Sequence, residues 1–378
     1  MKRNLRSGYT TGACAAAAAK GAALMLVKQD FVTEVRIDLP AGVSATFQLH
    51  GQSFSANDAS CFVVKDAGDD PDITNGAEVH ALVRRSPASP SATGENEAVI
   101  EGGTGIGRVT KPGLAIPPGE WAINPVPRIM IQQSVDSVLS KSTIHHSTFN
   151  IVISIPDGAE RAKKTLNDRL GIIGGLSILG TTGIVRPISA KAWTDTIDAS
   201  LDVAKACGCR TVVLSTGRSS EMAAQKHLSP IPEEAYIMMG DHVAYALRAC
   251  AVRGFMDPII ACQFAKLLKI ACGYENTHAA ASELDLAVLK EWAEAAHVPP
   301  EHLAIIADAN TAREIALSTG FDRDLMGLVA CRARQAASVH TPGIQVRPLL
   351  CGYDGKVVTS PGNNIYNQSD EDREFQKP

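Results

Sequence analysis

Hydrophobic and polar positions in the first half of the chain alternate in short stretches separated by glycine-rich turns. The alternation predicts strands over residues 35–39, 45–49, 61–64, 79–83, 98–101 and 150–155. Apolar residues at helical spacing predict helices over 13–27 and 132–139, and a further helix beginning near 160. The proline-, serine- and glycine-rich segment 84–97 predicts a mobile loop that joins a pair of strands. We therefore expect an α+β domain with glycine-rich loops over residues 1–189.

A different rhythm begins after residue 187, where apolar runs alternate with amphipathic helical patterns. Strands are predicted at 211–215, 235–239, 258–261 and 302–307. Helices are predicted at 195–206, 242–253, 264–271, 283–296 and 311–318. This order is typical of a Rossmann-like α/β domain with a mainly parallel sheet, over residues 190–360. Residues 361–378 predict a polar, poorly ordered tail.

Length and composition narrow the class of protein. A chain of 378 residues suits two domains, and its net charge of −4 argues against nucleic acid or an anionic membrane as a partner. The nine cysteines are scattered without zinc-site spacing, so we expect buried thiols in a reducing compartment and no metal site. The N-terminal alanine run is interrupted by Lys20 and lacks a convincing cleavage site. These features predict a cytoplasmic protein that does not cross a membrane.

Two motifs in the first half carry candidate chemistry. Thr10, Thr11 and Gly12 precede the alanine-rich helix, where free N–H groups and hydroxyls form either an anion site or an ordinary capped, tightly packed helix. Residues 66–72 then hold four aspartates directly after an apolar strand. Calcium is not favoured, because Ala81 stands where an EF-hand loop needs glutamate. The loop is a turn or a functional site with equal weight, and its like charges need a cation or hydrogen-bond donors nearby.

Glycine-rich segments and strand ends add further candidates. Residues 101–108 match the E-x-G-x-G-x-G pattern of common methyltransferases, but prolines follow where that pattern needs a helix. Residues 175–182 resemble a P-loop, yet Thr181 replaces the phosphate-binding lysine. Both segments are therefore either packing contacts or a ligand cradle. In the second half, strands end at 215–218 and 239–241, where parallel sheets receive ligands, and Asp241 or Glu221 is placed to hold ribose hydroxyls.

Six blocks of the sequence resemble one family. Residues 5–22, 63–78, 107–131, 170–189, 239–247 and 265–278 are similar, in this order, to the cobalt-precorrin-5B C(1)-methyltransferases, the CbiD family. The resemblance spans nearly the whole chain. It departs at Asn75, where the family commonly has histidine, and at residues 262–265, which replace a Gly-His approach to Lys266.

The resemblance implies an enzyme that methylates C-1 of cobalt-precorrin-5B to give cobalt-precorrin-6A, in the anaerobic, early-cobalt route to cobalamin. It implies S-adenosylmethionine as donor and cobalt only within the substrate. The protein would mainly align donor and ring carbon and exclude water. Two alternatives stay open, a Rossmann-type oxidoreductase of the same pathway and a non-catalytic corrinoid carrier. The sequence leaves homo-oligomerisation open.

The resemblance also raises the motifs to expected site elements. The expected catalytic residues are Asp69, Asp70 and Asp72. The expected tetrapyrrole-binding residues are Thr10, Thr11, Lys65, Arg108, Lys111, Arg128, Gly174, Gly175, Thr181 and Thr182. The expected donor-binding residues are Thr216, Gly217, Glu221, Gly240, Asp241, Lys266 and His278.

Overall fold

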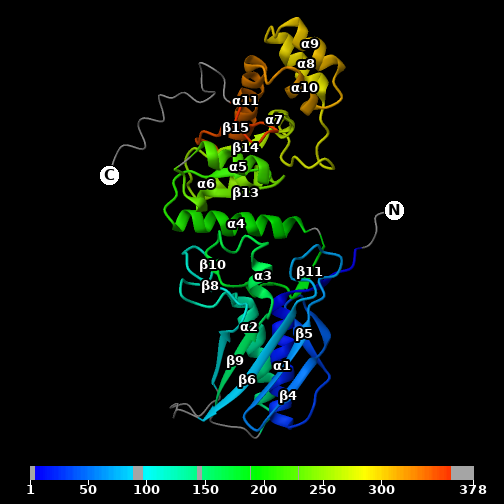
Figure 1. The fold of residues 1–378 in the computed structure, drawn as a ribbon, viewed down its shortest axis with the longest axis vertical. Helices are drawn as coiled ribbons and strands as arrows, with labels where there is room; N and C mark the ends of the chain where they lie inside the picture. Colours follow the sequence, from blue (N-terminus) through cyan, green and yellow to red (C-terminus); the bar gives the residue numbers. More distant parts are fainter. Residues whose placement is uncertain (1–4, 88–96, 143–146, 188, 229, 359–378) are drawn as a thin grey trace. The chain divides into compact units, whose positions relative to one another are not determined.

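The computed structural model describes residues 5–87, 97–142, 147–187, 189–228 and 230–358. They form two compact units, Met1–Ser189 and Ala190–Pro378 (Figure 1). The predicted tail, and most of the predicted loop at 84–97, lie outside the described residues. Each unit is built around its own hydrophobic core.

A five-stranded sheet forms the frame of the first unit. Its strand order is β4 (His50–Phe54), β5 (Asp58–Val64), β6 (Glu78–Pro87), β9 (Ser147–Ser154) and β7 (Glu97–Gly102). Neighbouring strands are antiparallel except β7, which pairs parallel with β9. The prediction that β6 and β7 form a strand pair is therefore wrong, because β9 lies between them. Sequence proximity suggested a hairpin, but the parallel register to β9 places β7 at the sheet edge.

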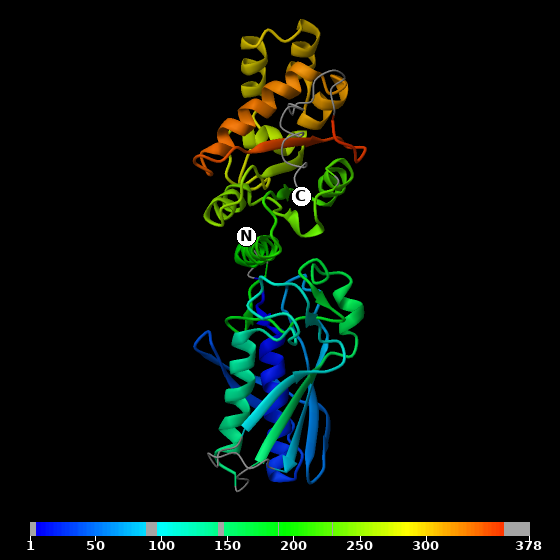
Figure 2. The same cartoon turned by 90° about the vertical axis from the view of Figure 1, so that its left-hand side faces the viewer.

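Two helices cover one face of this sheet, as Figure 2 shows. They are α1 (Thr11–Lys28) and α2 (Pro125–Leu139). Every second residue of β5, namely Ala59, Cys61 and Val63, faces them and is buried. The alanines of α1 are small enough to let α2 and the sheet approach closely, so that this helix is buried on almost every side.

Short strand pairs close the end of the unit that carries the loops. β1 (Gly8–Tyr9) pairs with β11 (Ile184–Val185), and β8 (Arg108–Val109) pairs with β10 (Ile172–Ile173). The hairpin of β2 (Glu34–Leu39) and β3 (Val43–Gln48) and the helix α3 (Gly158–Ala162) complete the unit. The pairing brings the beginning and the end of the first unit together.

The second unit contains a parallel sheet of four strands. Their order is β13 (Tyr236–Met238), β12 (Val213–Ser215), β14 (Ile259–Gln263) and β15 (Arg347–Cys351). Leu214 packs into the core shared with α4 (Ala190–Ala206), α6 (Val243–Val252) and α7 (Phe264–Ala271). Val213, its neighbour, faces the opposite side and packs with α5 (Arg218–His227). Helices thus cover both faces of a mixed α/β unit with a parallel sheet.

Further helices follow α7 before β15, where a strand was expected at 302–307. They are α8 (Leu286–Ala295), α9 (Pro300–Asp308), α10 (Ala312–Ser318) and α11 (Arg323–Ser338). The predicted strand is therefore wrong and forms α9, which Pro300 begins with its fixed φ angle. Within the described ranges, no helix is both long and apolar enough to cross a membrane.

Candidate active site

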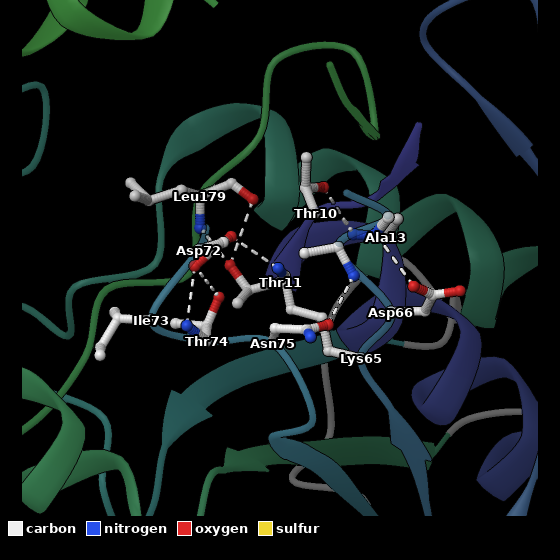
Figure 3. Close-up of polar contacts among 12 residues, drawn as sticks. Thr10, Thr11, Ala13, Lys65, Asp66, Asp72, Ile73, Thr74, Asn75 and Leu179 are labelled. Carbon is white, nitrogen blue, oxygen red and sulfur yellow. Dashed lines mark hydrogen bonds and ion pairs between the residues drawn. The ribbon is translucent and has the colours of Figure 1, made fainter. Parts of the chain in front are cut away.

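Three segments far apart in sequence meet at the beginning of α1 (Figure 3). The N–H of Tyr9 donates to the Asp66 carbonyl oxygen at 2.7 Å, which attaches the aspartate-rich loop. The N–H groups of Thr10 and Gly12 donate to the carbonyl oxygens of Gly183 at 3.0 Å and Leu179 at 2.9 Å. The structure therefore brings together the Thr-Thr-Gly, aspartate-rich and second glycine-rich motifs.

The first turn of α1 is closed by the protein itself. Thr10 is the N-cap, and its Oγ1 accepts from the Ala13 N–H at 3.2 Å. Thr11 is buried, and its Oγ1 accepts from the Leu179 N–H at 2.9 Å. The Thr10 cap, together with the bond from the Gly12 N–H to the Leu179 carbonyl oxygen, satisfies N–H groups that an anion would otherwise use. They support the capped-helix interpretation over an anion site made from this turn.

Cations and backbone donors offset the crowded aspartates. The Arg6 guanidinium pairs with Asp66, and the Arg6 N–H donates to Asp69 Oδ2 at 2.7 Å. The Arg6 hydrogen bond, with that of the Gly68 N–H, holds the pKa of Asp66 below its ordinary value. The sequence analysis required such donors but did not single out Arg6, because it lies 60 positions from Asp66.

Lys65 lies inside the first unit rather than at a binding surface. Its side chain is 1% exposed, and its Nζ donates to Asp72 Oδ2 at 2.6 Å. Asp72 Oδ1 accepts from the N–H and the hydroxyl of Thr74 at 2.7 and 2.6 Å. Burial alone would raise the pKa of Asp72, but these hydrogen bonds outweigh it and the pKa is lowered. Lys65 thus neutralises Asp72 within the fold, contrary to the expectation that it meets a substrate carboxylate.

A second cation holds the far side of the same loop. Nη1 of Arg161 donates to the carbonyl oxygens of Ile73 at 2.6 Å and Asn75 at 3.0 Å. Asn75 Oδ1 accepts from the Ala67 N–H at 2.9 Å, so the residue that departs from the family pattern has a structural contact here. Asp70 is half-buried on this clamped loop. The arrangement holds the loop rigidly, as a positioned polar group requires.

The glycine-rich segments are packed against each other, backbone to backbone. A Cβ atom added at Gly175 would lie 2.3 Å from the Gly105 carbonyl oxygen, and one at Gly107 would lie 3.0 Å from the Gly175 carbonyl oxygen. The packing interpretation therefore accounts for Gly175. Gly174 has a φ of +87°, and a Cβ atom added there would meet no atom within 4 Å. Its need for glycine therefore comes from the turn conformation of the backbone and not from packing. Thr181 and Thr182 are exposed.

The basic residues expected to bind the tetrapyrrole contact carbonyl oxygens and an aromatic ring of the first unit. Arg108 lies over the Trp121 ring at 4.0 Å, and Lys111 Nζ donates to the Arg169 carbonyl oxygen at 3.2 Å. Arg128 donates to the carbonyl oxygens of Ile123, Ile100 and Trp121 at 3.0, 3.2 and 3.4 Å. Carbonyl oxygens bind a guanidinium without cancelling its charge. Arg128 therefore brings positive charge to an open groove of about 360 Å³ lined also by Ala98, Ile100, Ile129, Gln132 and Gln133.

In the second unit, the donor-binding candidates gather at the carboxyl edge of the parallel sheet. Thr216 and Gly217 follow β12, and Gly240 and Asp241 follow β13. The N–H groups of Met239 and Gly240 donate to the Ser215 carbonyl oxygen at 2.9 and 3.3 Å, which joins the two strand ends. Parallel strands present such ends at one edge.

Asp241 is the centre of a polar network at this edge. Lys266 pairs with Asp241, and the Thr277 hydroxyl donates to Asp241 Oδ1 at 2.6 Å. Lys269 Nζ donates to the Thr277 carbonyl oxygen at 3.2 Å. Burial would raise the pKa of Asp241, but the hydrogen bonds from Lys266 and Thr277 outweigh it, with a smaller contribution from His278. Asp241, Lys266 and His278 are thus brought together. Thr277 and Lys269 were not among the expected donor-binding residues, although Lys269 matches the family pattern.

Glu221 does not reach the same surface. Its side chain is 1% exposed, and the Arg218 Nη1 lies 3.8 Å from its Oε2. Burial, followed by the Glu221 carboxylate, raises the pKa of Tyr236 on the neighbouring strand. The expectation that Glu221 holds ribose hydroxyls does not fit this position, because helix α5 turns the carboxylate into the protein.

Comparisons with known proteins decide the family. The CbiD family model matches residues 1–187, and the model for the CbiD C-terminal domain matches residues 276–362. The chain is 60% identical to the cobalt-precorrin-5B C(1)-methyltransferase of Pelobacter propionicus, over 95% of this chain and 97% of the relative. It is 56% identical to the protein of that name from Geobacter sulfurreducens, over 94% and 98%. The chain belongs to the CbiD family.

A solved structure is also similar to this CbiD-family chain. It is described as a cobalamin biosynthesis protein (cbiD) from Archaeoglobus fulgidus, with 30% identity over 70% of this chain and 79% of that one. The TM-score is 0.38. In this chain, the aspartate-rich loop and the carboxyl edge of the parallel sheet offer positioned hydrogen-bond donors and acceptors. No group of three or more histidine, cysteine, aspartate or glutamate residues able to hold a metal ion occurs in the described ranges.

Proposed function

We propose that this CbiD-family protein transfers a methyl group to C-1 of cobalt-precorrin-5B and so acts in cobalamin biosynthesis. The observation that carries the proposal is the 60% identity, over nearly both full lengths, to a relative named for this reaction. S-adenosylmethionine is the donor, the product is cobalt-precorrin-6A, and the cobalt enters as part of the substrate. We assign the reaction to the cytoplasm and to the anaerobic route.

Geometry is the main requirement of such a transfer. The sulfonium donor is already activated, and an electron-rich ring carbon attacks the methyl carbon as the carbon–sulfur bond breaks. The sulfur keeps the electron pair and loses its positive charge, giving S-adenosylhomocysteine. Holding the two reactants in line and excluding water supplies much of the rate enhancement. The clamped loop that carries Asp69, Asp70 and Asp72 is suited to positioning one reactant.

We further propose a division of binding between the units. The first unit holds the tetrapyrrole, since Arg108, Lys111 and Arg128 carry positive charge on its loop-bearing side. The second unit holds the donor. Its strand order, β13-β12-β14-β15, is Rossmann-like and reverses direction between β12 and β14, the position where such sheets receive nucleosides.

The test is turnover with authentic substrate. Purified protein, cobalt-precorrin-5B and S-adenosylmethionine labelled in its methyl group are expected to give labelled pigment one methyl group heavier. Folded protein that leaves the pigment unlabelled would overturn the proposal. Consumption of a nicotinamide cofactor would indicate the oxidoreductase instead, and tight pigment binding without donor binding would indicate a carrier.

A further inference from the structure

An open groove in the first unit lies between α2 and β7, the strand at the edge of the sheet. It has a volume of about 360 Å³, and its lining residues are Ala98 and Ile100 of β7 and Arg128, Ile129, Gln132 and Gln133 of α2. The α2 residues fall on two successive turns and therefore share one face of the helix. Because strand residues alternate, the two β7 residues face α2, whereas Glu101 faces the other side of the sheet and accepts from the Asn150 amide at 2.8 Å. None of the described residues that line the groove is acidic.

Arg128 reaches this groove with part of its hydrogen-bonding capacity unused. A guanidinium has five N–H groups. In Arg128, Nε, Nη1 and Nη2 each donate once, to the carbonyl oxygens of Ile123, Ile100 and Trp121. One N–H on each terminal nitrogen therefore has no partner within the part of the chain that the structure describes. A guanidinium with these two groups left still binds a carboxylate strongly, because the hydrogen bonds are charge-assisted.

The positive charge of Arg128 is also left without a carboxylate partner among the described residues. Other cations of the first unit have such partners, since Lys65 pairs with Asp72 and Lys163 with Glu160. The three carbonyl contacts fix the position of the Arg128 guanidinium without cancelling its charge. The groove thus has a positioned cation that is available to an anion.

Apolar side chains and amides make up the rest of the groove. Ile129 is 54% exposed, and the two β7 residues of the groove are only partly buried. The Gln132 amide donates to Asp136 Oδ1 at 2.9 Å, whereas the exposed Gln133 amide makes no hydrogen bond to any described residue. A cation, a free amide and exposed hydrocarbon in one groove fit a ligand group that joins a carboxylate to a short hydrocarbon chain.

We propose that this groove binds a carboxylate-bearing side arm of the tetrapyrrole. Arg128 pairs with the carboxylate, Ile129 packs against the hydrocarbon part of the arm, and Gln133 donates from its amide. The inference rests on the proposed function and deepens it, because it assigns one edge of the macrocycle to a defined place in the first unit. Pockets that enclose a whole drug-sized ligand measure about 300–1,000 Å³, so a groove of about 360 Å³ holds part of a macrocycle and not all of it.

The first experiment changes the charge of the groove without altering the contacts of Arg128. Gln133→Glu would place a second carboxylate beside that of the arm, and Gln133→Lys would add a second cation. We expect the dissociation constant of cobalt-precorrin-5B to rise about two- to fivefold in the first variant and to fall by a similar factor in the second. Absorbance titration of the pigment measures both, with S-adenosylhomocysteine present so that no methyl group is transferred.

Matched controls carry the same charge changes elsewhere. Thr46 is exposed on β3, outside the groove, so Thr46→Glu and Thr46→Lys change the net charge of the chain equally. Both are expected to bind the pigment with the wild-type dissociation constant. Gln133 variants that bind as their Thr46 counterparts do, with normal turnover, would overturn this inference and leave the proposed function standing.

The second experiment separates charge from shape by repeating the titrations in 1 M salt. The screening length there is about 3 Å, so Gln133→Glu and Gln133→Lys are expected to bind cobalt-precorrin-5B nearly alike. Ile129→Ser removes apolar surface and no charge, and its loss of about two- to fivefold in affinity should persist. Equal losses in the two Gln133 variants that remain in 1 M salt would show a distorted fold and overturn the inference. Wild-type protein that neither binds nor methylates the pigment would overturn the proposed function as well.

Discussion

At the scale of single residues, the pair of Lys65 and Asp72 shows how the aspartate-rich loop is held. A buried ammonium group without a counter-charge is destabilising, and Asp72 supplies that counter-charge while also bonding Thr74. The shape of the loop and the pairing of Lys65 therefore depend on the same carboxylate.

Removing that carboxylate is expected to be costly. Asp72→Asn leaves Lys65 buried without a counter-charge, and we expect a loss of about 3 kcal/mol or more in the free energy of unfolding. The double variant Lys65→Met with Asp72→Asn is expected to recover part of the loss. Denaturant titration of the two single variants and the double variant measures the coupling. Additive losses would show that the pair does not interact in this way.

The same pair predicts a pH dependence. Because the folded-state pKa of Asp72 is lowered, its contribution to stability is complete above the ordinary aspartate pKa of about 3.9 and is lost as pH falls through the lower folded value. The double variant should therefore lose less stability than the wild type below about pH 4. Melting temperatures across that range make the comparison.

Asp70, on the same loop, is expected to behave differently. Asp70→Asn preserves shape and removes charge, so we expect turnover to fall by about a hundredfold, the effect of a positioned polar group. Its free energy of unfolding should change by less than about 0.5 kcal/mol. Equal, modest losses of rate and stability would assign Asp70 to the turn.

At the scale of elements, the two glycine-rich segments of the first unit pack closely against each other, backbone to backbone. Gly175→Ala would place a methyl group 2.3 Å from the Gly105 carbonyl oxygen and force the segments apart. We expect it to destabilise the protein by several times as much as Gly174→Ala, which meets no atom and costs about 1 kcal/mol for its positive φ. Thermal unfolding of the two variants tests this, and equal effects would show that the packing adapts.

Hydrophobic periodicity predicted most of the helices and strands, but it did not predict which strands pair with each other. The helix at 264–271 coincides with α7, and the buried alternation of β5 and β6 follows the predicted strands. The strand predicted at 302–307 is α9, because a short apolar run fits either period. Helices α5 and α11 and strand β15 were not predicted. Pro348 within β15 discourages a strand assignment, which an edge position tolerates.

The site was predictable as a set of motifs and not as a set of contacts. Asp241 and Lys266 were both candidates, but no local pattern shows that they pair across 25 positions. Arg6, Arg161 and Thr277 act through partners remote in sequence and therefore left no local signal. The burial of Lys65 and Glu221 was likewise set by packing, since charged residues are ordinarily exposed.

At the scale of the whole molecule, the division of ligands between the units has a direct test. Lys111→Ala is expected to weaken pigment binding and leave S-adenosylhomocysteine affinity near the wild-type value, whereas Asp241→Ala should do the reverse. Lys111 is a sharper probe than Arg128, whose three carbonyl contacts also hold the fold. Calorimetric titration of each ligand measures both effects.

Matched controls are available in each unit. Lys163 and Asp195 belong to exposed ion pairs, with Glu160 and Lys191, so their alanine variants should change neither affinity. If Lys111→Ala loses S-adenosylhomocysteine and keeps the pigment, the assignment of the two units is reversed.

The pairing of β1 with β11 also has a consequence for biosynthesis on the ribosome. Residues 8–12 are held by residues 179–185, so this segment meets its partners only after about 170 further residues have been synthesised. At about 5–20 residues per second, roughly ten to thirty seconds separate the two. Throughout that interval the apolar helix α1 has left the ribosome without part of its covering. A polypeptide that stops before residue 179 would therefore lack the backbone partners that hold residues 8–12.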